Sequence, residues 1–564
     1  MLSLDSFRFL TQVLTEPDGR RGMTQPTDRS GTEAGRTATG AAGPDRRQIL
    51  LRGAAGALVG TALSGSAWPV GAIAQAAPAL PDAGASFTAA TLPDLARALA
   101  ARPYVAPRTD DLPDALRSLT REQYAAIRTV PAARIWETAD LGFTLEPLHR
   151  GFVYTDPVSI ALVEDGTVRP LAYARDRFET GGLTLPESAQ DPGFSGFRVR
   201  ARFGGDALSD FAIFQGASFF RLVARGQGFG LNARALTLRP ADSRGEEFPR
   251  WRAFFIEKPG IGGPLVVHAL IDSESAVGAL RLTLRPGDAS VVDVEGTIVT
   301  RAAIDHLGLA AMQTSYLFGA HDQRGADDAR AGAYASGGLQ IRNGGGEAIW
   351  RPVRNPPTLQ ISSFIDEDPK GFGLMQRARD YATFEDDVQH WEWRPSLWVE
   401  PLGAAGVEGL WGAGAVTLLE IPSDSELNEN VLAYWRPKVS VPARTEARFS
   451  YRQVWCWQPS TAPPVAIVSG TRSGRGSQGP RRRFVVDFTG DILFPEGAAQ
   501  NWEIVLLAGP GTITAQTLYP YPDRRTVRVA FELDPGGERA SELRLALKVG
   551  GRQLTETWLY RWTA

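Results

Sequence analysis

Aromatic rings and carboxylates are concentrated in residues 369–401 (PKGFGLMQRARDYATFEDDVQHWEWRPSLWVEP). A sugar binds by stacking its apolar ring face on an aromatic side chain and by donating hydroxyl hydrogens to carboxylate oxygens. The segment therefore indicates a carbohydrate site, although a packed sheet edge with surface acids would have the same composition. Its aromatic residues are Phe372, Tyr381, Phe384, Trp391, Trp393 and Trp398, and its carboxylates are Asp380, Glu385, Asp386, Asp387, Glu392 and Glu400.

A second group of carboxylates lies within residues 420–435 (EIPSDSELNENVLAYW), where Asp424, Glu426 and Glu429 stand in a polar loop between two apolar runs. Hydrolysis of a glycosidic bond requires one carboxyl group that protonates the leaving oxygen and a second that activates water or attacks the sugar. A loop carboxylate beside aromatic residues suits the first role better than a carboxylate in a strand. Most single carboxylates are solvated surface acids, and spacing alone does not choose among these three.

Other kinds of chemistry find no support in the sequence. It contains no G-x-x-x-x-G-K-[ST], G-x-S-x-G or H-E-x-x-H motif, and no G-x-G-x-x-G that opens a helix. We therefore expect no metal and no cofactor, and catalysis would depend on carboxylates. The net charge of −3 and the lack of a Lys/Arg run in the folded part argue against nucleic acid as a partner. The single cysteine, Cys456, excludes a disulfide within the chain. The five histidines, none with a second at metal-ligand spacing, are His149, His268, His306, His321 and His390.

Residues 1–76 have the features of a disordered extension followed by an export signal. Paired arginines at 46–47 precede a weakly apolar, Gly/Ala-rich run at 53–70, and Ala74 and Ala76 offer a cleavage site. This pattern is typical of the twin-arginine route to the periplasm, and a fortuitous arginine pair is the alternative. The run is too weakly apolar to span a bilayer, so no stable membrane insertion is expected after cleavage.

The rest of the chain is predicted to form mostly β-strands. Sixty glycines and 39 prolines indicate many turns. Two short helices are expected at 92–99 and 112–128, before the strands begin near residue 141. Hairpins are expected at 280–299, with its turn at 286–288, and at 541–562, with its turn at 550–551.

A boundary near 437–442 divides the expected strands into two β-sandwich domains. The first spans residues 83–437, and the second spans 443–564 with about seven short strands, the size of an immunoglobulin-like domain. Within the second domain, Ser469–Arg483 is rich in Gly, Ser and Arg and is expected to be a mobile loop or a lid over a cleft.

Several longer motifs run through the chain: 196–199 (GFRV), 216–221 (GASFFR), 246–249 (EEFP), 350–352 (WRP), 369–376 (PKGFGLMQ), 394–401 (RPSLWVEP) and 555–560 (TETWLY). Through these motifs the chain resembles the periplasmic glucans biosynthesis proteins G and D (OpgG/OpgD, also called MdoG/MdoD) from about Leu92 to its end. The export signal is more similar to that of the D type. The resemblance implies a large N-terminal β-sandwich of galactose-mutarotase type and a small immunoglobulin-like C-terminal sandwich. It also implies a role in making osmoregulated periplasmic glucans, whose backbone is β-1,2-linked glucose.

The resemblance assigns the catalytic positions unevenly. The general acid of D-type, anomer-inverting β-1,2-glucanases is an Asp in a loop of type I-P-x-x-x-E-x-x-D-N, and Glu429 stands there with Glu426 as its neighbour. The general base is an Asp in an H-D-S motif, which here reads Tyr334-Ala335-Ser336. Alanine cannot accept a proton. The loss of a positioned base typically costs about 10²–10⁴-fold in rate.

Two functions remain open. In the first, the protein is a transglycosylase or hydrolase of β-1,2-glucan with Glu429 as general acid, in which another carboxylate such as Asp322, Asp327 or Asp328 takes the nucleophile's proton. In the second, it binds and presents glucan without cutting it. The expected partner is β-1,2-glucan, and a homodimer is compatible with the sequence. The expected substrate-binding residues are Trp391, Trp350, Arg351, Arg394 and Tyr334.

Overall fold

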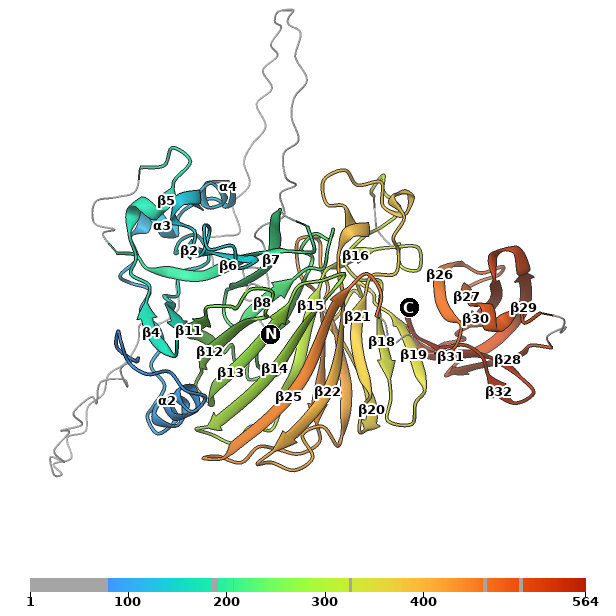
Figure 1. The fold of residues 1–564 in the computed structure, drawn as a ribbon. Helices are drawn as coiled ribbons and strands as arrows, with labels where there is room; N and C mark the ends of the chain where they lie inside the picture. The colour runs from blue at the N-terminus through green and yellow to red at the C-terminus, as the bar shows by residue number, and fades with distance from the viewer. Residues whose placement is uncertain (1–79, 185–190, 206, 324–326, 460–463, 497–500) are drawn as a thin grey trace, which may run out of the picture. The chain divides into compact units, whose positions relative to one another are not determined.

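The computed structural model describes residues 80–184, 191–205, 207–323, 327–459, 464–496 and 501–564. The predicted signal sequence lies outside the described residues. The described chain consists mostly of β-strands, as expected, and no helix in it is long and apolar enough to cross a membrane. Figure 1 shows the strands in layers, with α3 (Asp114–Arg117) and α4 (Arg121–Ala125) above the left of the view and β16 (Tyr316–Phe318) above the right.

Two large sheets form the body of the protein. A 15-stranded sheet is antiparallel except where β3 meets β11 and where β33 meets β19. Its strands, in spatial order, are β28 (Glu503–Gly509), β31 (Ala540–Val549), β33 (Thr557–Thr563), β19 (Ala348–Pro352), β18 (Gly338–Arg342), β21 (Gly371–Met375), β22 (Ser396–Ala405), β25 (Glu446–Cys456), β14 (Ala289–Thr300), β13 (Ala276–Arg285), β12 (Leu265–Asp272), β11 (Arg250–Glu257), β3 (Ser159–Glu164) and β4 (Thr167–Pro170), with β32 (Arg552–Gln553) on β31.

The second sheet has 10 strands and carries most of the candidate site. Its strands, in spatial order, are β2 (Phe143–His149), β6 (Phe194–Arg202), β7 (Leu208–Gln215), β8 (Phe219–Leu222), β9 (Leu231–Arg234), β15 (Leu307–Thr314), β24 (Val431–Pro437), β23 (Ala413–Glu420) and β20 (Gln360–Glu367), with β10 (Thr237–Leu238) on β15.

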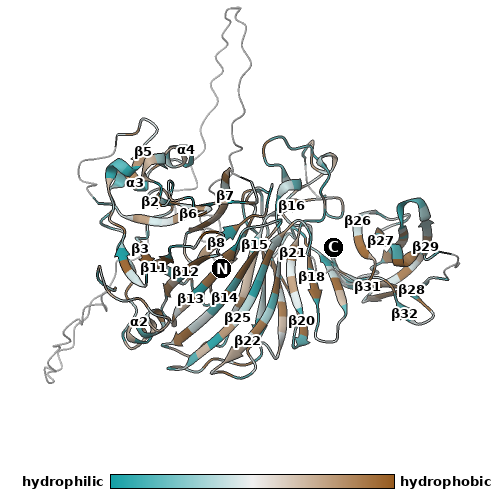
Figure 2. Cartoon of the chain, viewed as in Figure 1, coloured by the Kyte–Doolittle hydropathy of each residue, from teal (hydrophilic) through white to brown (hydrophobic). Residues whose placement is uncertain are grey.

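The two sheets pack on a shared hydrophobic core, which makes a β-sandwich. Phe197 and Phe214 of the 10-stranded sheet meet Phe254 of the 15-stranded sheet, with ring centroids 4.9 Å and 5.8 Å from it. Buried and more exposed positions alternate along β14, as they must in a strand with only one face in the core. Figure 2 shows the result as mixed brown and teal along β13, β14 and β25.

Both predicted hairpins are confirmed. β13 and β14 pair from Ala276–Thr300 to Arg285–Val291, and β31 pairs with β33. The first helix is α2 (Thr91–Ala100), as expected. The prediction of one helix at 112–128 is wrong, because the structure has two short helices there, α3 and α4. Thr120 caps the start of α4 by accepting a hydrogen bond from the backbone N–H of Gln123, and this cap separates α4 from α3.

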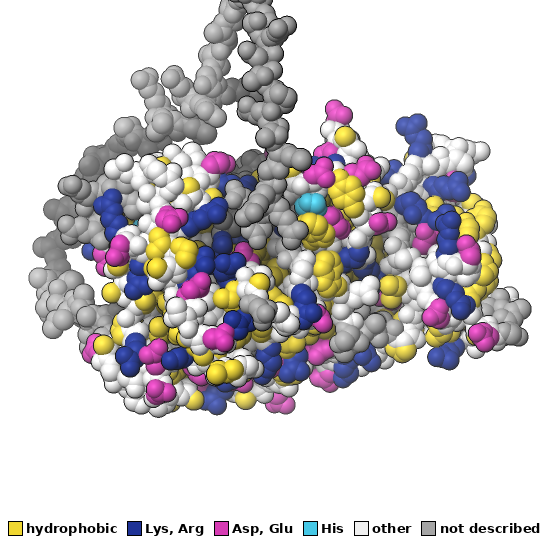
Figure 3. Space-filling model, turned by 45° about the horizontal axis from the view of Figure 1, so that its top comes forward, with side chains coloured by type: hydrophobic (Ala, Val, Ile, Leu, Met, Phe, Trp, Pro, Cys, Tyr) yellow, Lys and Arg dark blue, Asp and Glu magenta, His cyan; other side chains and the backbone are white. Residues whose placement is uncertain are grey.

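The C-terminal strands form a smaller sandwich. A four-stranded sheet of β26 (Ile467–Arg475), β27 (Arg482–Thr489), β30 (Thr526–Asp534) and β29 (Thr512–Tyr521) packs on β28, β31 and β33. The predicted loop at Ser469–Arg483 is wrong, because most of it pairs as the β26–β27 hairpin, with Arg475 opposite Arg482. Figure 3 shows basic side chains gathered over this part of the chain, at the right of the view.

The strand after the predicted domain boundary does not belong to the smaller sandwich. β25 pairs with β14 and β22 in the middle of the 15-stranded sheet. The division into domains at 437–443 stays a prediction, but residues 446–456 fold with the larger part.

Candidate active site

Three polar side chains form one row across β8, β9 and β15. Asn232 pairs with Gln313, and β8 pairs with β9 so that Arg221 lies beside Asn232. Side chains alternate along a strand, so this row projects from the face opposite the main core. The neighbours in the chain that do lie in that core are Phe220, Leu222, Leu231, Ala233 and Met312.

The carboxyl group of Glu429 contacts this row. Its two oxygens accept hydrogen bonds from the side-chain amides of Asn232 and Gln313. Burial raises the pKa of Glu429, although the nearby Arg221 and the two amide donors favour the charged form. A carboxyl group with a raised pKa keeps its proton closer to neutral pH, which a general acid requires.

A buried ion pair orients one of these amides. Nε of Arg234 donates to Oε1 of Gln313 at 2.6 Å, so the amide nitrogen of Gln313 is the end that faces Glu429. The same guanidinium pairs with Glu246, and both side chains are buried. Glu246, Arg234 and Gln313 thus form a chain of contacts that ends at the candidate acid.

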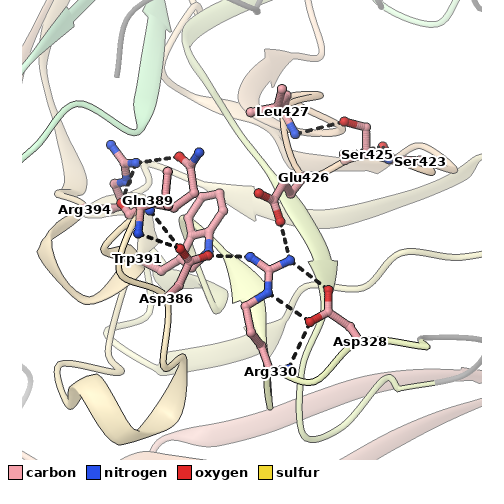
Figure 4. Close-up of polar contacts among 11 residues, drawn as sticks. Asp328, Arg330, Asp386, Gln389, Trp391, Arg394, Ser423, Ser425, Glu426 and Leu427 are labelled. Atoms are coloured by element: carbon pink, nitrogen blue, oxygen red, sulfur yellow. Dashed lines mark hydrogen bonds and ion pairs between the residues drawn. The ribbon is translucent and has the colours of Figure 1, made fainter. Parts of the chain in front are cut away.

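Glu426 belongs to a second cluster, which is centred on Arg330. Nη2 of Arg330 lies 2.6 Å from Glu426 and 2.8 Å from Asp328, and Nη1 pairs with Asp386. Figure 4 shows the three carboxylates around the one guanidinium. The hydrogen bonds from Arg330 lower the pKa of Asp328 to about 2, which makes Asp328 a weak base.

Asp386 connects this cluster to the aromatic segment. Nε1 of Trp391 donates to Oδ2 of Asp386 at 3.0 Å, and the backbone N–H groups of Val388 and Gln389 donate to Oδ1 at 3.0 and 2.9 Å. Trp391 is only 3% exposed and packs in a cluster with Phe384. The ring face that was expected to stack on a sugar at Trp391 is therefore covered.

Arg394 connects the aromatic segment to β9. Its guanidinium lies 5.4 Å from the ring centroid of Trp391 and donates to the carbonyl oxygen of Phe229. Burial lowers the pKa of Arg394 to about 10. Arg394 therefore bonds Phe229, and Glu429 bonds Asn232, which follows three residues later in the chain. Both side chains are held by the same short stretch, residues 229–232.

These contacts close a circuit around one region of the sheet face. The loop that carries both glutamates is fixed by Asn430, whose side-chain amide donates to the carbonyl oxygens of Tyr316 and Ile421, each at 3.0 Å. The structure therefore connects Glu429, Glu426, Trp391 and Arg394 through contacts in one region, and their roles in binding or catalysis stay predictions. In order around the circuit, the residues are Glu429, Asn232, Phe229, Arg394, Trp391, Asp386, Arg330 and Glu426.

Trp350 and Arg351 lie outside this circuit. Trp350 packs in the core of the C-terminal sandwich, with the guanidinium of Arg377 3.6 Å from its ring centroid. Arg351 is buried and forms an ion pair with the buried Glu420 at 3.2 Å. These contacts give both residues a packing role in place of the expected contact with substrate.

Tyr334 and Ala335 lie in the cluster that covers Trp391. Tyr334 stacks on Tyr316 with ring centroids 5.3 Å apart. Ala335 is fully buried, and its backbone N–H donates to the carbonyl oxygen of Ser315 at 3.0 Å. The position to which the resemblance assigns the base is thus a buried apolar position.

The other carboxylates considered as bases have different surroundings. Asp322 is buried, accepts the backbone N–H of Asn355 at 3.0 Å and lies 3.7 Å from Arg354. Asp327 is exposed. Among the residues that the structure describes, no group of three or more His, Cys, Asp or Glu side chains could hold a metal ion.

One accessible ring of the aromatic segment was not among the expected substrate-binding residues. Trp393 is 44% exposed, and one face of it stacks on His390 with ring centroids 3.8 Å apart. The backbone carbonyl of Trp393 accepts the N–H of Gly228 at 3.2 Å, which places it beside the Phe229 stretch of the circuit. The abundance of aromatic residues pointed to this segment, but it does not tell which tryptophan is exposed.

Comparisons with known proteins place these residues in a wider context. The family model described as "Periplasmic glucan biosynthesis protein, MdoG" matches residues 87–562. The chain is 42% identical over 478 residues to Glucans biosynthesis protein G of Shewanella sp. (strain W3-18-1), covering 83% of this chain and 86% of that protein. It is 41% identical over 485 residues to protein G of Vibrio cholerae (strain ATCC 39541 / Classical Ogawa 395 / O395), covering 85% and 87%. It is 41% identical over 525 residues to protein G of Bradyrhizobium diazoefficiens, covering 92% and 100%. These names give no support to the expected closeness to the D type.

Proposed function

Because the chain belongs to the MdoG family of periplasmic glucan biosynthesis proteins, we propose that it acts in the periplasm on a β-1,2-linked glucan. In this proposal it is an anomer-inverting transglycosylase or hydrolase in which Glu429 is the general acid. Export would depend on the twin arginines at 46–47, as expected for a signal of the D type. The observation that carries the proposal is the Glu429 carboxyl, which is held by two amide donors on a polar sheet face.

Glu429 has the environment of a proton donor. Its pKa is raised by burial, whereas Arg330 lowers the pKa of Asp328 in the neighbouring cluster. Carboxyl groups whose pKa values are moved apart in this way supply the acid and the charged partner of a glycosidase pair. Glu429 would protonate the oxygen of the leaving sugar, and the cluster around Arg330 would stay negatively charged.

The nucleophile's proton has no acceptor at Ala335. Two carboxylates of the cluster around Arg330, Glu426 and Asp386, are both bound to that guanidinium. A sugar hydroxyl of a second glucan chain can be placed by binding on an accessible ring such as Trp393, and this placement offsets part of the loss of a base. The proposal therefore favours transfer to a sugar over transfer to water.

The test is product analysis with Glu429→Gln as the decisive variant. Linear β-1,2-glucan is incubated with wild-type protein, and the products are identified by mass spectrometry and NMR. The variant should make no product while it binds glucan with nearly unchanged affinity. Glu503→Gln, an exposed position on β28, is the matched control. Turnover by Glu429→Gln at the wild-type rate would remove Glu429 from the mechanism.

A second function, glucan binding without cleavage, is favoured by the buried alanine at position 335. It predicts glucan affinity with no product at any enzyme concentration. In that case Glu429→Gln and the wild type would be indistinguishable in product analysis. The expected homodimer stays a prediction, which sedimentation would test.

A further inference from the structure

The 10-stranded sheet has one covered edge and one open edge. At its first strand, β2, Ile135 lies along the edge and exchanges backbone hydrogen bonds with Leu145 at 3.0 and 3.2 Å. At its last strand, β20, no strand of the described chain pairs on the side away from β23. Bulges, prolines, lysines or a very short strand commonly protect such an edge. β20 is eight residues long, contains neither proline nor lysine, and pairs with β23 without a register shift.

The backbone groups that face the open side belong to the odd-numbered residues of β20. Just beyond the strand, the N–H of Asp368 donates to the carbonyl oxygen of Gly412 at 3.2 Å. Hydrogen-bonded pairs alternate along an antiparallel ladder, so the even-numbered residues bond β23 and the odd-numbered residues face away from it. Ile361, Ser363 and Ile365 therefore present their N–H and C=O groups to the place where a further strand would lie.

The acidic end of β20 is closed by the chain itself. Oδ1 of Asp366 accepts the backbone N–H of Glu367 at 2.8 Å. The two oxygens of Asp366 also accept the N–H of Gly344, at 3.0 and 3.1 Å, from the turn between β18 and β19. The open part of the edge is therefore the segment 361–365.

The open segment carries exposed apolar side chains. Ile361 is 48% exposed and Ile365 is 90% exposed. Both lie on the face opposite Phe364, which packs against the main core, because side chains alternate along a strand. Ser363 is exposed between them on the same face. An unpaired edge with exposed apolar side chains is a surface to which another strand adds.

The open segment is complementary to itself. In an antiparallel pair centred on Ser363, each Ile361 lies opposite Ile365 of the second copy, and all three outward-facing residues use both their N–H and C=O groups. The acidic residues 366–368 then lie beside the uncharged residues 358–360 of the second copy. A parallel pair would place the acidic residues of the two copies side by side, where like charges repel. The charges and the apolar side chains thus favour the antiparallel pair.

We propose that two copies of this chain form a two-fold symmetric dimer in which their β20 strands pair antiparallel about Ser363 and join the two 10-stranded sheets. Such an interface uses the same surface of both copies, as two-fold symmetry requires. β23 and β24 separate the join from β15, so each copy keeps its own candidate site. The dimer does not depend on the proposed function, and the failure of either leaves the other standing.

The first test places a charge in the interface. Ile365→Lys is compared with wild type by sedimentation equilibrium. The wild type should be a dimer, and Ile365→Lys should bind its second copy about 10-fold more weakly or worse, because an ammonium replaces an apolar contact with Ile361. Ile261→Lys is the matched control, because Ile261 is 87% exposed in the turn between β11 and β12. A dimer that Ile365→Lys does not weaken would overturn the proposal. A monomeric wild type would also overturn it and leave the edge to a strand of another protein.

The second test measures the register. The two Ser363 Cα atoms should lie about 5.5 Å apart as a hydrogen-bonded pair, a separation that a disulfide spans. Ser363→Cys should therefore form a covalent dimer on mild oxidation. Ile365→Cys is the control and should not, because the two Ile365 Cα atoms would be roughly 13 Å apart. The natural cysteine, Cys456, is buried. No cross-link in Ser363→Cys, or equal cross-linking in both variants, would show that the copies do not pair about Ser363.

Discussion

Arg234 and Gln313 are joined by a 2.6 Å hydrogen bond from the guanidinium Nε to the amide Oε1, and this bond decides which end of the amide meets Glu429. If the amide were turned over, an oxygen would face the carboxylate and repel it. The acid's position therefore depends on a residue that does not touch it. Arg234 is in this sense a positioning residue, and Glu246 holds it in turn.

Arg234→Met should destabilise the fold. The substitution leaves Glu246 buried without its cation, and breaking a buried pair in this way typically costs about 3–5 kcal/mol. The free energy of unfolding is measured in urea. Glu246→Gln, which keeps Arg234 and its bond to Gln313, is the comparison and should lose less. A loss below about 1 kcal/mol in Arg234→Met would show that water or another group takes over the partner's role.

Glu429→Gln should be more stable than wild type at pH 7. Burial raises the pKa of Glu429 in the folded protein above the value of about 4.3 that is usual for an unfolded glutamate. The contribution of Glu429 to stability is fully present below that value and is lost as the pH rises through the folded pKa. Glutamine cannot ionise, so the difference between variant and wild type should grow with pH and vanish below about pH 4.

This experiment consists of urea unfolding at pH values from about 4 to 8. Glu426→Gln serves as the opposite case, because it removes an ion pair with Arg330 and leaves that guanidinium with one carboxylate fewer. It should be less stable than wild type near neutral pH. A Glu429→Gln variant that is less stable than wild type at pH 7 would contradict a raised pKa.

Trp393→Ala should weaken glucan binding while the fold stays intact. The exposed ring offers an apolar face to a sugar, and its loss is expected to lower affinity by about 5- to 100-fold. Tyr519→Ala is the matched control, because Tyr519 is 43% exposed on β29 of the C-terminal sandwich. Equal glucan affinity in both variants would exclude Trp393 as a binding surface.

Cys456 should not react with thiol reagents in the folded protein. It is buried at the end of β25, and burial raises the pKa of its thiol to about 12. The thiolate is the reactive form, so labelling at pH 8 should be negligible until a denaturant unfolds the sheet. Rapid labelling under native conditions would show that β25 opens locally.

Patterns within one stretch of chain predicted the fold well. The hairpin of β13 and β14 depends on alternating residues and a Pro-Gly turn, and both are visible in the sequence. The prediction of a loop at Ser469–Arg483 was wrong because it relied on composition, and Gly, Ser and Arg are typical of loops. They form a hairpin here because β27 also pairs with β30 and is held from both sides.

The site was predictable only in part, because its polar shell comes from distant strands. Glu426 and Glu429 were found through a loop motif. Asn232 and Gln313 have no local signature, and they meet Glu429 only because β9 and β15 are neighbours in the sheet. Trp350 was expected at the site because of its motif. It packs among the C-terminal strands instead, because β19 pairs with β33, and this pairing between distant segments has no local signature in the sequence.

The position of β25 has a consequence for how the chain reaches its native state. This strand lies between β14 and β22, so in the described 15-stranded sheet it joins the part that contains residues 250–300 to the part that contains residues 338–405. During synthesis, both parts have unpaired edges until residues 446–456 have left the ribosome. Contacts over such long sequence separations slow folding, and open edges invite association with other chains. A nascent chain that ends before residue 446 should therefore be prone to aggregate and depend on chaperones, although most of its hydrophobic core has already been made.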